Sequence, residues 1–152
     1  NTINNNSIDF ESHFFNPFLV FFSFLILSIY FSFRQIKYAI KYFLFDALFF
    51  VVSGMIGCLL IYLWFFTDHL SSFNFNLIWA LPSNMIIGIL LLINPEKSFI
   101  KWYMFVYGIL LTTLLILWQW IPQNLSEVLI LFILGIIIRL FVNYMSISKL
   151  RL

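Results

Sequence analysis

The chain contains five long apolar stretches, each close to the length that a helix needs to cross a bilayer. A spanning helix requires about 20 mostly apolar residues. The stretches are continuous rather than alternating in polarity, which favours helices over strands. They occupy residues 17–33, 43–66, 77–94, 103–121 and 128–147. The sequence therefore predicts an all-α integral membrane bundle of about five transmembrane helices.

The composition agrees with a chain that lies mostly in lipid. Only 9% of its 152 residues are charged and 63% are hydrophobic, whereas soluble domains carry about 25% charged residues. So few charges cannot cover a surface that faces water, and membrane lipids are the expected surroundings. No basic cluster is interleaved with exposed aromatic residues, so nucleic acid is not an expected partner.

The distribution of basic residues predicts the orientation of the bundle. Lys and Arg outside the apolar stretches lie only in segments 34–41, 97–101 and 149–151. Cytoplasmic loops of multi-spanning proteins carry such an excess of Lys and Arg. We therefore expect the N-terminus to lie outside the cytoplasm and the C-terminus inside it. Residues 1–16 then form an extracytoplasmic polar segment, and residues 17–152 form the five-helix domain.

The sequence contains no recognisable catalytic constellation, metal site or cofactor motif. Its single cysteine, Cys58, lies in an apolar stretch, where a reactive thiol is not favoured. No Cys/His spacing suits a metal ion, and no Ser lies in a nucleophile motif. The catalytic residues of any enzyme activity are therefore not identified from this chain.

The first residues do not read as a signal peptide. The chain begins with Asn1 rather than Met, and residues 1–12 are polar, without a basic segment followed by an apolar core. Either a segment was removed before Asn1 or the chain is the C-terminal part of a longer protein. We favour the second interpretation.

Polar and Trp side chains gather at the predicted outer face, in and beside the loops after the second and fourth spans. They suggest a lipid or substrate site, because such sites combine an apolar slot with a few polar groups. Asp68 and His69 could also serve acid–base chemistry. The alternative is an ordinary aromatic belt with a helix C-terminus that favours a cationic imidazole. The candidate residues are Trp64, Asp68, His69, Asn74, Asn76, Trp79 and Gln123.

Pro82 lies inside the third apolar stretch. Proline removes one backbone hydrogen bond from a helix, and in a membrane the freed carbonyl must find a partner in the bundle or in water. The residue predicts either a re-entrant or kinked outer half that is open to water, or a simple kink that packing absorbs.

Two ionisable residues, Asp46 and Arg139, lie within the second and fifth spans. A charge near the centre of a bilayer costs about 2.5–3.5 kcal/mol on insertion scales. Both residues are expected in the inner half of the bundle, where they could form an intramembrane ion pair. Arg139 could instead extend its guanidinium to the inner interface. A structural role is favoured over an ion path, because a path needs more polar steps than two.

Small residues repeat with a spacing of four along the second span. Ser53 with Gly57, and Gly54 with Cys58, would lie on one face of a helix. Small residues at this spacing allow two membrane helices to approach closely. We therefore expect a tight helix contact here and interpret Cys58 as a packing residue.

Several strings between residues 45 and 125 resemble a known family. The most specific are Thr67-Asp68-His69 and Asn74-Phe75-Asn76-Leu77-Ile78-Trp79-Ala80-Leu81-Pro82, with Pro122-Gln123-Asn124-Leu125 later in the chain. They resemble the C-terminal membrane region of the Bacteroidetes Lnb family. The resemblance implies lipoprotein N-acylation, in which an acyl chain moves to the α-amino group of a lipoprotein's N-terminal cysteine. It also implies a bacterial inner-membrane location. The family's presumed thiol catalyst lies in a periplasmic papain-like domain that has no counterpart here.

Two functional hypotheses remain open. The first is the membrane module of a lipoprotein N-acyltransferase-like protein, which holds lipid or lipoprotein at the outer face beside a periplasmic catalytic domain. The second is a non-enzymatic membrane subunit that anchors or assembles a complex with other membrane proteins. A transporter is disfavoured, because the sequence shows no internal repeat and only two charges within its spans.

The orientation can be tested by labelling single cysteines. Cysteines introduced at Ser7 and Ser72 should react with an impermeant thiol reagent in cells whose inner membrane is intact, because both positions lie on the side without Lys and Arg. Reaction only after the inner membrane is breached would contradict the predicted orientation.

Overall fold

The computed structural model describes residues 16–66 and 74–149. Within these residues the protein is all helical, with five helical segments long and apolar enough to cross a membrane. The predicted all-α five-span bundle is therefore confirmed. The segments are α2 (Pro17–Tyr38), α3 (Phe43–Phe66), the 3-10 helix η2 (Phe75–Ile78) followed by α4 (Ser83–Ile93), α5 (Ser98–Ile116) and α6 (Leu129–Lys149), with a short 3-10 helix η3 (Trp118–Trp120) after α5.

Helix α2 is longer than the apolar stretch that predicted it. It begins at Pro17, where the side chain of Asn16 accepts a hydrogen bond from the N–H of Phe18 at 3.0 Å. Proline suits the first helical position because its missing N–H would be unpaired there anyway. The helix continues to Tyr38 rather than residue 33, and its C-cap is Ala39, whose φ is 55°. Its polar last turns are retained because Gln35 is buried against α6.

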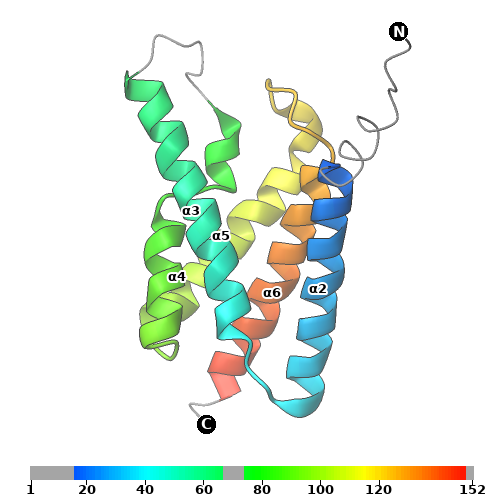
Figure 1. Cartoon of the computed structure of the whole chain (residues 1–152), viewed down its shortest axis with the longest axis vertical. Coiled ribbons are helices and arrows are strands. Elements are labelled where there is room, and N and C mark those ends of the chain that lie inside the picture. The colour runs from blue at the N-terminus through cyan, green and yellow to red at the C-terminus, as the bar shows by residue number, and fades with distance from the viewer. Residues whose placement is uncertain (1–15, 67–73, 150–152) are drawn as a thin grey trace, which may run out of the picture.

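The helices pack as two closely joined pairs with a fifth helix beside them. α3 lies along α4, α2 lies along α6, and α5 also packs on α6 (Figure 1). The turn between α2 and α3 and the turn between α4 and α5 lie at the same end of the bundle as the last residues of α6. These turns carry Lys41 and Lys97, and we call this end the basic end. The start of α2, the end of α3, η2 and η3 lie at the opposite end.

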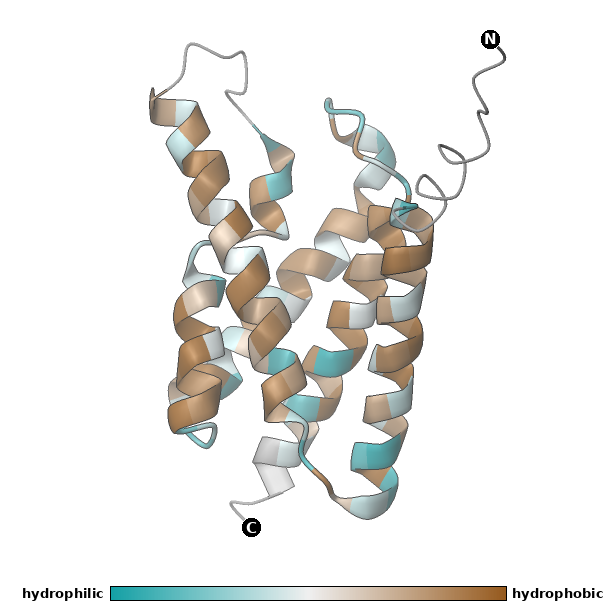
Figure 2. Ribbon diagram, in the orientation of Figure 1, coloured by the Kyte–Doolittle hydropathy of each residue, from teal (hydrophilic) through white to brown (hydrophobic). Residues whose placement is uncertain are grey.

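Hydrophobic residues cover most of the helical surface, as a lipid-facing bundle requires. Figure 2 shows hydrophobic colour along all five spans, with hydrophilic segments at the ends and a hydrophilic patch inside the bundle toward the basic end. Large apolar side chains such as Phe65 and Ile93 are more than 70% exposed. Such exposure would be unfavourable in water, but lipid chains solvate these side chains as well as a protein interior does.

Glycines allow α3 to touch α4 and the broken segment before it backbone to backbone. A Cβ atom at Gly54 would overlap the backbone of Met85, and one at Gly57 would overlap the carbonyl oxygen of Ala80. Both glycines are buried, whereas Cys58 is exposed. The expected tight contact is present, but the interpretation of Cys58 as a packing residue was wrong. The buried glycines are three residues apart, so they lie on one face of α3, whereas Cys58 lies outside that contact.

The close contact of α3 with the segment just before α4 predicts that two Gly→Ala changes will differ in their effect on stability. Gly57→Ala should lower the free energy of unfolding by about 1–3 kcal/mol, the usual cost of forcing extra volume into a tight contact. Gly108→Ala is the matched control, because its Cβ would meet only a Leu140 methyl at 4.0 Å. Unfolding of both variants in detergent micelles measures the difference. Equal destabilisation would contradict this account of the interface.

Candidate functional site

The third span is broken at its proline into two helical pieces. η2 ends at Ile78 and α4 begins at Ser83, with Pro82 immediately before it. The N–H of Ala80 still bonds to the carbonyl of Asn76 at 3.0 Å, but the regular ladder does not run through Pro82. The break follows from the missing proline N–H, and it leaves the Trp79 carbonyl available to side chains.

Polar side chains from α3, α4 and α5 form a hydrogen-bonded group around the Trp79 carbonyl. Asn84 is fully buried, and its amide nitrogen donates to the Ser53 hydroxyl at 3.0 Å and to the Trp79 carbonyl at 3.4 Å. The Tyr107 hydroxyl also donates to that carbonyl. The Tyr103 hydroxyl donates to the amide oxygen of Asn84 at 2.6 Å. The Trp79 carbonyl at the break is thus paired within the protein, as irregular backbone at membrane depth requires.

A second set of hydrogen-bonded polar side chains lies at the end of the bundle opposite the basic end, where it joins the start of η2 to the segment after η3. We call Asn74, Asn76 and Gln123 the amide cluster. The Asn74 side-chain oxygen accepts from the backbone and side-chain nitrogens of Asn76 at 3.0 and 2.9 Å, and from the Gln123 amide at 3.4 Å. The Gln123 oxygen accepts from the N–H of Phe75 at 2.7 Å. The structure therefore brings together residues that are nearly 50 positions apart in the chain.

Trp79 links the amide cluster to the core. Its indole N–H donates to the Asn76 side-chain oxygen at 2.8 Å, and its ring and that of Phe132 on α6 are nearly perpendicular, with 5.5 Å between centroids. Only 8% of Trp79 is exposed. The indole is therefore a buried side chain that supports the amide cluster, and it does not line an open binding site.

The remaining candidates at this end are placed differently. Trp64, near the end of α3, is 37% exposed and stacks on Phe65 with 5.5 Å between ring centroids. Asp68 and His69 lie outside the described residues. Four of the seven outer-face candidates are thus hydrogen-bonded neighbours, namely Asn74, Asn76, Trp79 and Gln123.

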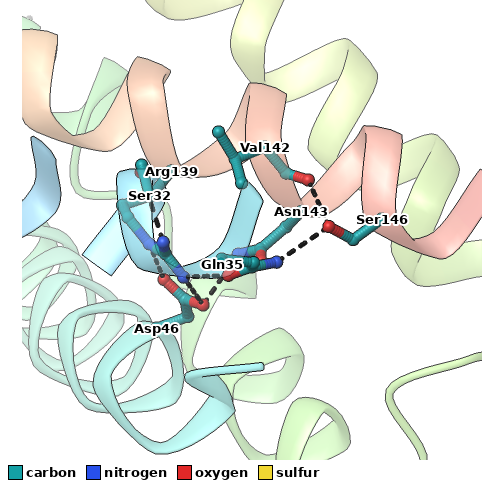
Figure 3. A network of polar contacts seen from close by, with 7 residues as sticks. All are labelled: Ser32, Gln35, Asp46, Arg139, Val142, Asn143 and Ser146. Carbon is teal, nitrogen blue, oxygen red and sulfur yellow. Dashed lines mark hydrogen bonds and ion pairs between the residues drawn. The ribbon is translucent and has the colours of Figure 1, made fainter. Parts of the chain in front are cut away.

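The other candidate pair, Asp46 and Arg139, forms a buried ion pair toward the basic end. The guanidinium donates through Nε to Asp46 Oδ1 and through one terminal nitrogen to Oδ2, both at 2.7 Å (Figure 3). Both side chains are fully buried. Such a two-bond contact fixes geometry as well as charge. Asp46 also lies in the first turn of α3, where the helix dipole favours a negative charge.

Four neutral side chains complete this site, which we call the charge network. The Arg139 guanidinium donates to the Ser32 hydroxyl at 3.2 Å and to the Gln35 amide oxygen at 2.9 Å. Asn143 donates to Asp46 at 2.7 Å. The Gln35 amide nitrogen then donates to Asn143 at 3.0 Å and to Ser146 at 2.9 Å. The charge network therefore ties α2, α3 and α6 together with its charges paired inside the bundle.

Comparison with known proteins identifies the family. The family model of the Lnb transmembrane domain, whose name specifies five transmembrane helices, matches residues 9–151. The chain belongs to the Lnb transmembrane domain family. The resemblance drawn from the sequence strings is thereby confirmed. Searches of curated proteins and of solved structures found no match.

The polar interior of this Lnb transmembrane domain was mostly missed by the sequence analysis. The buried residues of α2 are Ser28, Ser32 and Gln35, spaced by four and three along one helical face. Arg139, Asn143 and Ser146 show the same spacing on α6. Two apolar helices that each carry a polar stripe are expected to place the stripes against each other in a membrane. This periodicity was the signal that could have located the charge network.

The charge network of the Lnb domain predicts that breaking its buried ion pair costs much more stability than breaking the exposed pair between Lys41 and Glu96. Asp46→Ala should lower the free energy of unfolding by about 3–5 kcal/mol, because it leaves the Arg139 guanidinium buried without its counter-ion. The double variant Asp46→Ala/Arg139→Met should recover part of this loss. Equilibrium unfolding in mixed micelles measures both.

The exposed ion pair between Lys41 and Glu96, at 3.5 Å, is the matched control. Glu96→Ala should cost at most about 1 kcal/mol, the usual upper value for surface pairs. If Asp46→Ala were no more harmful than Glu96→Ala, the charge network would not hold the bundle together.

Proposed function

We propose that the chain is the membrane module of a lipoprotein N-acyltransferase of the bacterial inner membrane. It holds lipid or lipoprotein at the outer face of the membrane, beside a periplasmic catalytic domain outside this chain. The match of the Lnb transmembrane domain to residues 9–151 carries this proposal. The reaction transfers an acyl chain to an amine, and the membrane module's part is to position a lipid-bearing substrate.

The position of the amide cluster supports the proposal. The cluster lies at the end opposite the basic end (Figure 1). If the basic end is cytoplasmic, as the Lys and Arg distribution predicts, the cluster faces the periplasm. Amide donors and acceptors there suit the ester and amide groups at the head of an acylated substrate, while exposed apolar side chains such as Trp64 and Phe65 suit its chains.

The alternative function, a membrane anchor that assembles a complex, has one specific observation in its favour. The side chains of the amide cluster bond to one another and to the backbone of η2. This pattern is also what a purely structural cap of a broken helix requires. The two functions predict different rates of lipoprotein N-acylation when a side chain of the amide cluster is replaced and the fold is kept.

The test is a set of alanine variants in the full protein, in cells whose lipoprotein N-acylation depends on it. Asn76→Ala, Gln123→Ala and His69→Ala should each reduce N-acylation about tenfold, which corresponds to about 1.4 kcal/mol of lost transition-state stabilisation. Mass spectrometry of lipoprotein N-terminal peptides gives the acylated fraction over time. Gln119→Ala, an exposed amide of η3 at the same end, is the matched control and should leave the rate unchanged.

Stability decides the interpretation of this experiment. Each variant is compared with the unchanged protein for its amount in the membrane and its unfolding midpoint. Reduced acylation at normal stability supports a substrate-handling role. Normal acylation in all three variants would make the anchor the better description.

A further inference from the structure

A second site lies at the basic end, between α2 and α6. A cavity of about 390 Å³ opens there beside the charge network. Its polar lining comes from Gln35, Lys41 and Ser146, and its apolar lining includes Ile36, Phe141 and Met145. We propose that this cavity binds one anionic phospholipid, with the phosphate at Lys41 and the start of an acyl chain against the apolar wall. The proposal concerns the end opposite the amide cluster and does not depend on the proposed function.

The position of Lys41 is suited to a phosphate. Its side chain is 28% exposed, so the ammonium group is partly enclosed but still accessible. Lys41 Nζ lies 3.5 Å from Oε1 of Glu96, whose side chain is 61% exposed. The pair is therefore a weak surface contact, and a phosphate can take the place of the Glu96 carboxylate. Arg34 and Lys37 lie on the last turns of α2 just before it and add positive potential at this end.

The apolar wall indicates a lipid rather than a free anion. Ile36 is 73%, Phe141 65% and Met145 44% exposed, and all three lie on helices that cross the membrane. A cavity with a cation at its polar end and a wall continuous with the lipid-facing surface matches the two chemical parts of a phospholipid. A small anion such as inorganic phosphate would leave this apolar wall without an occupant.

The cavity also adjoins the site that joins the helices. Gln35 and Ser146 line it and are hydrogen-bonded to each other at 2.9 Å as part of the charge network (Figure 3). A phospholipid seated between α2 and α6 would therefore contact both helices next to their main polar connection. Bound lipid should stabilise the folded bundle, because any ligand that binds only the folded state does so.

The experiment measures binding of phosphatidylglycerol to the full protein in detergent by native mass spectrometry. The lipid titration is repeated with zwitterionic phosphatidylcholine. Lys41→Ala should weaken phosphatidylglycerol binding about fivefold, as expected for one basic side chain near an anionic headgroup. Lys41→Arg should keep most of the affinity. Lys97→Ala is the charge-matched control, because Lys97 lies at the same end but does not line the cavity.

A second pair of variants tests the apolar wall. Met145→Trp fills the cavity and should also weaken phosphatidylglycerol binding about fivefold. The bound acyl chain would lose burial of at least about one methylene group, which accounts for a change of this size. Met55→Trp is the matched control, because Met55 is 58% exposed on α3 and does not line the cavity. Glu96→Gln should preserve or raise the affinity, because it leaves Lys41 in place without a competing carboxylate.

Each result supports or overturns the proposal, provided that the unfolding midpoints of the variants stay normal. Selective loss in Lys41→Ala and Met145→Trp, with both controls unchanged, supports it. Equal losses in Lys41→Ala and Lys97→Ala would show only a general surface potential and overturn it. If phosphatidylcholine bound as tightly as phosphatidylglycerol, the proposal of an anionic headgroup would be overturned. Displacement of the lipid by inorganic phosphate at similar concentrations would show a free-anion site instead.

Discussion

The ion pair between Asp46 and Arg139 is the buried charged contact that links the two closely joined helix pairs of the bundle. α3 is joined to α4 by glycine contacts and α2 is joined to α6 along its length, and the ion pair links these two pairs of helices. Two charges in lipid are costly apart and attract strongly where little water screens them. The charge network therefore supplies a directional contact, which apolar packing between membrane helices does not.

The break at Pro82 follows the same rule at the other end. Lipid offers no hydrogen bonds, so the Trp79 carbonyl, which lies at the break, must be paired within the protein. Asn84 and Tyr107 provide that pairing from α4 and α5, and Gly57 lets α3 approach the broken segment. A proline that would weaken a regular helix is thus built into the helix contacts and shapes the end that carries the amide cluster.

The sequence predicted the spans better than the sites. Apolar length alone placed α3 correctly, from residue 43 to residue 66. It placed the end of α2 too early because Gln35 is polar and yet buried, and it began α5 too late because Lys101 lies within the helix, over the ring of Tyr144. The pairing of Asp46 with Arg139 was predicted because an unpaired charge within the membrane costs free energy. The neutral members of the charge network were missed because Ser, Asn and Gln in a span also occur on exposed faces.

By itself the sequence determined that the chain is a five-span helical membrane domain, and its strings pointed to the Lnb family. Continuous apolar runs leave a backbone in lipid no alternative to helices, so this inference needs no tertiary information. Only the tertiary structure decided which polar groups meet. Asp46 and Arg139 are 93 residues apart, and Gln123 reaches Asn74 across 49 residues. Such pairings depend on which helices lie side by side, and packing rather than local sequence selects those neighbours.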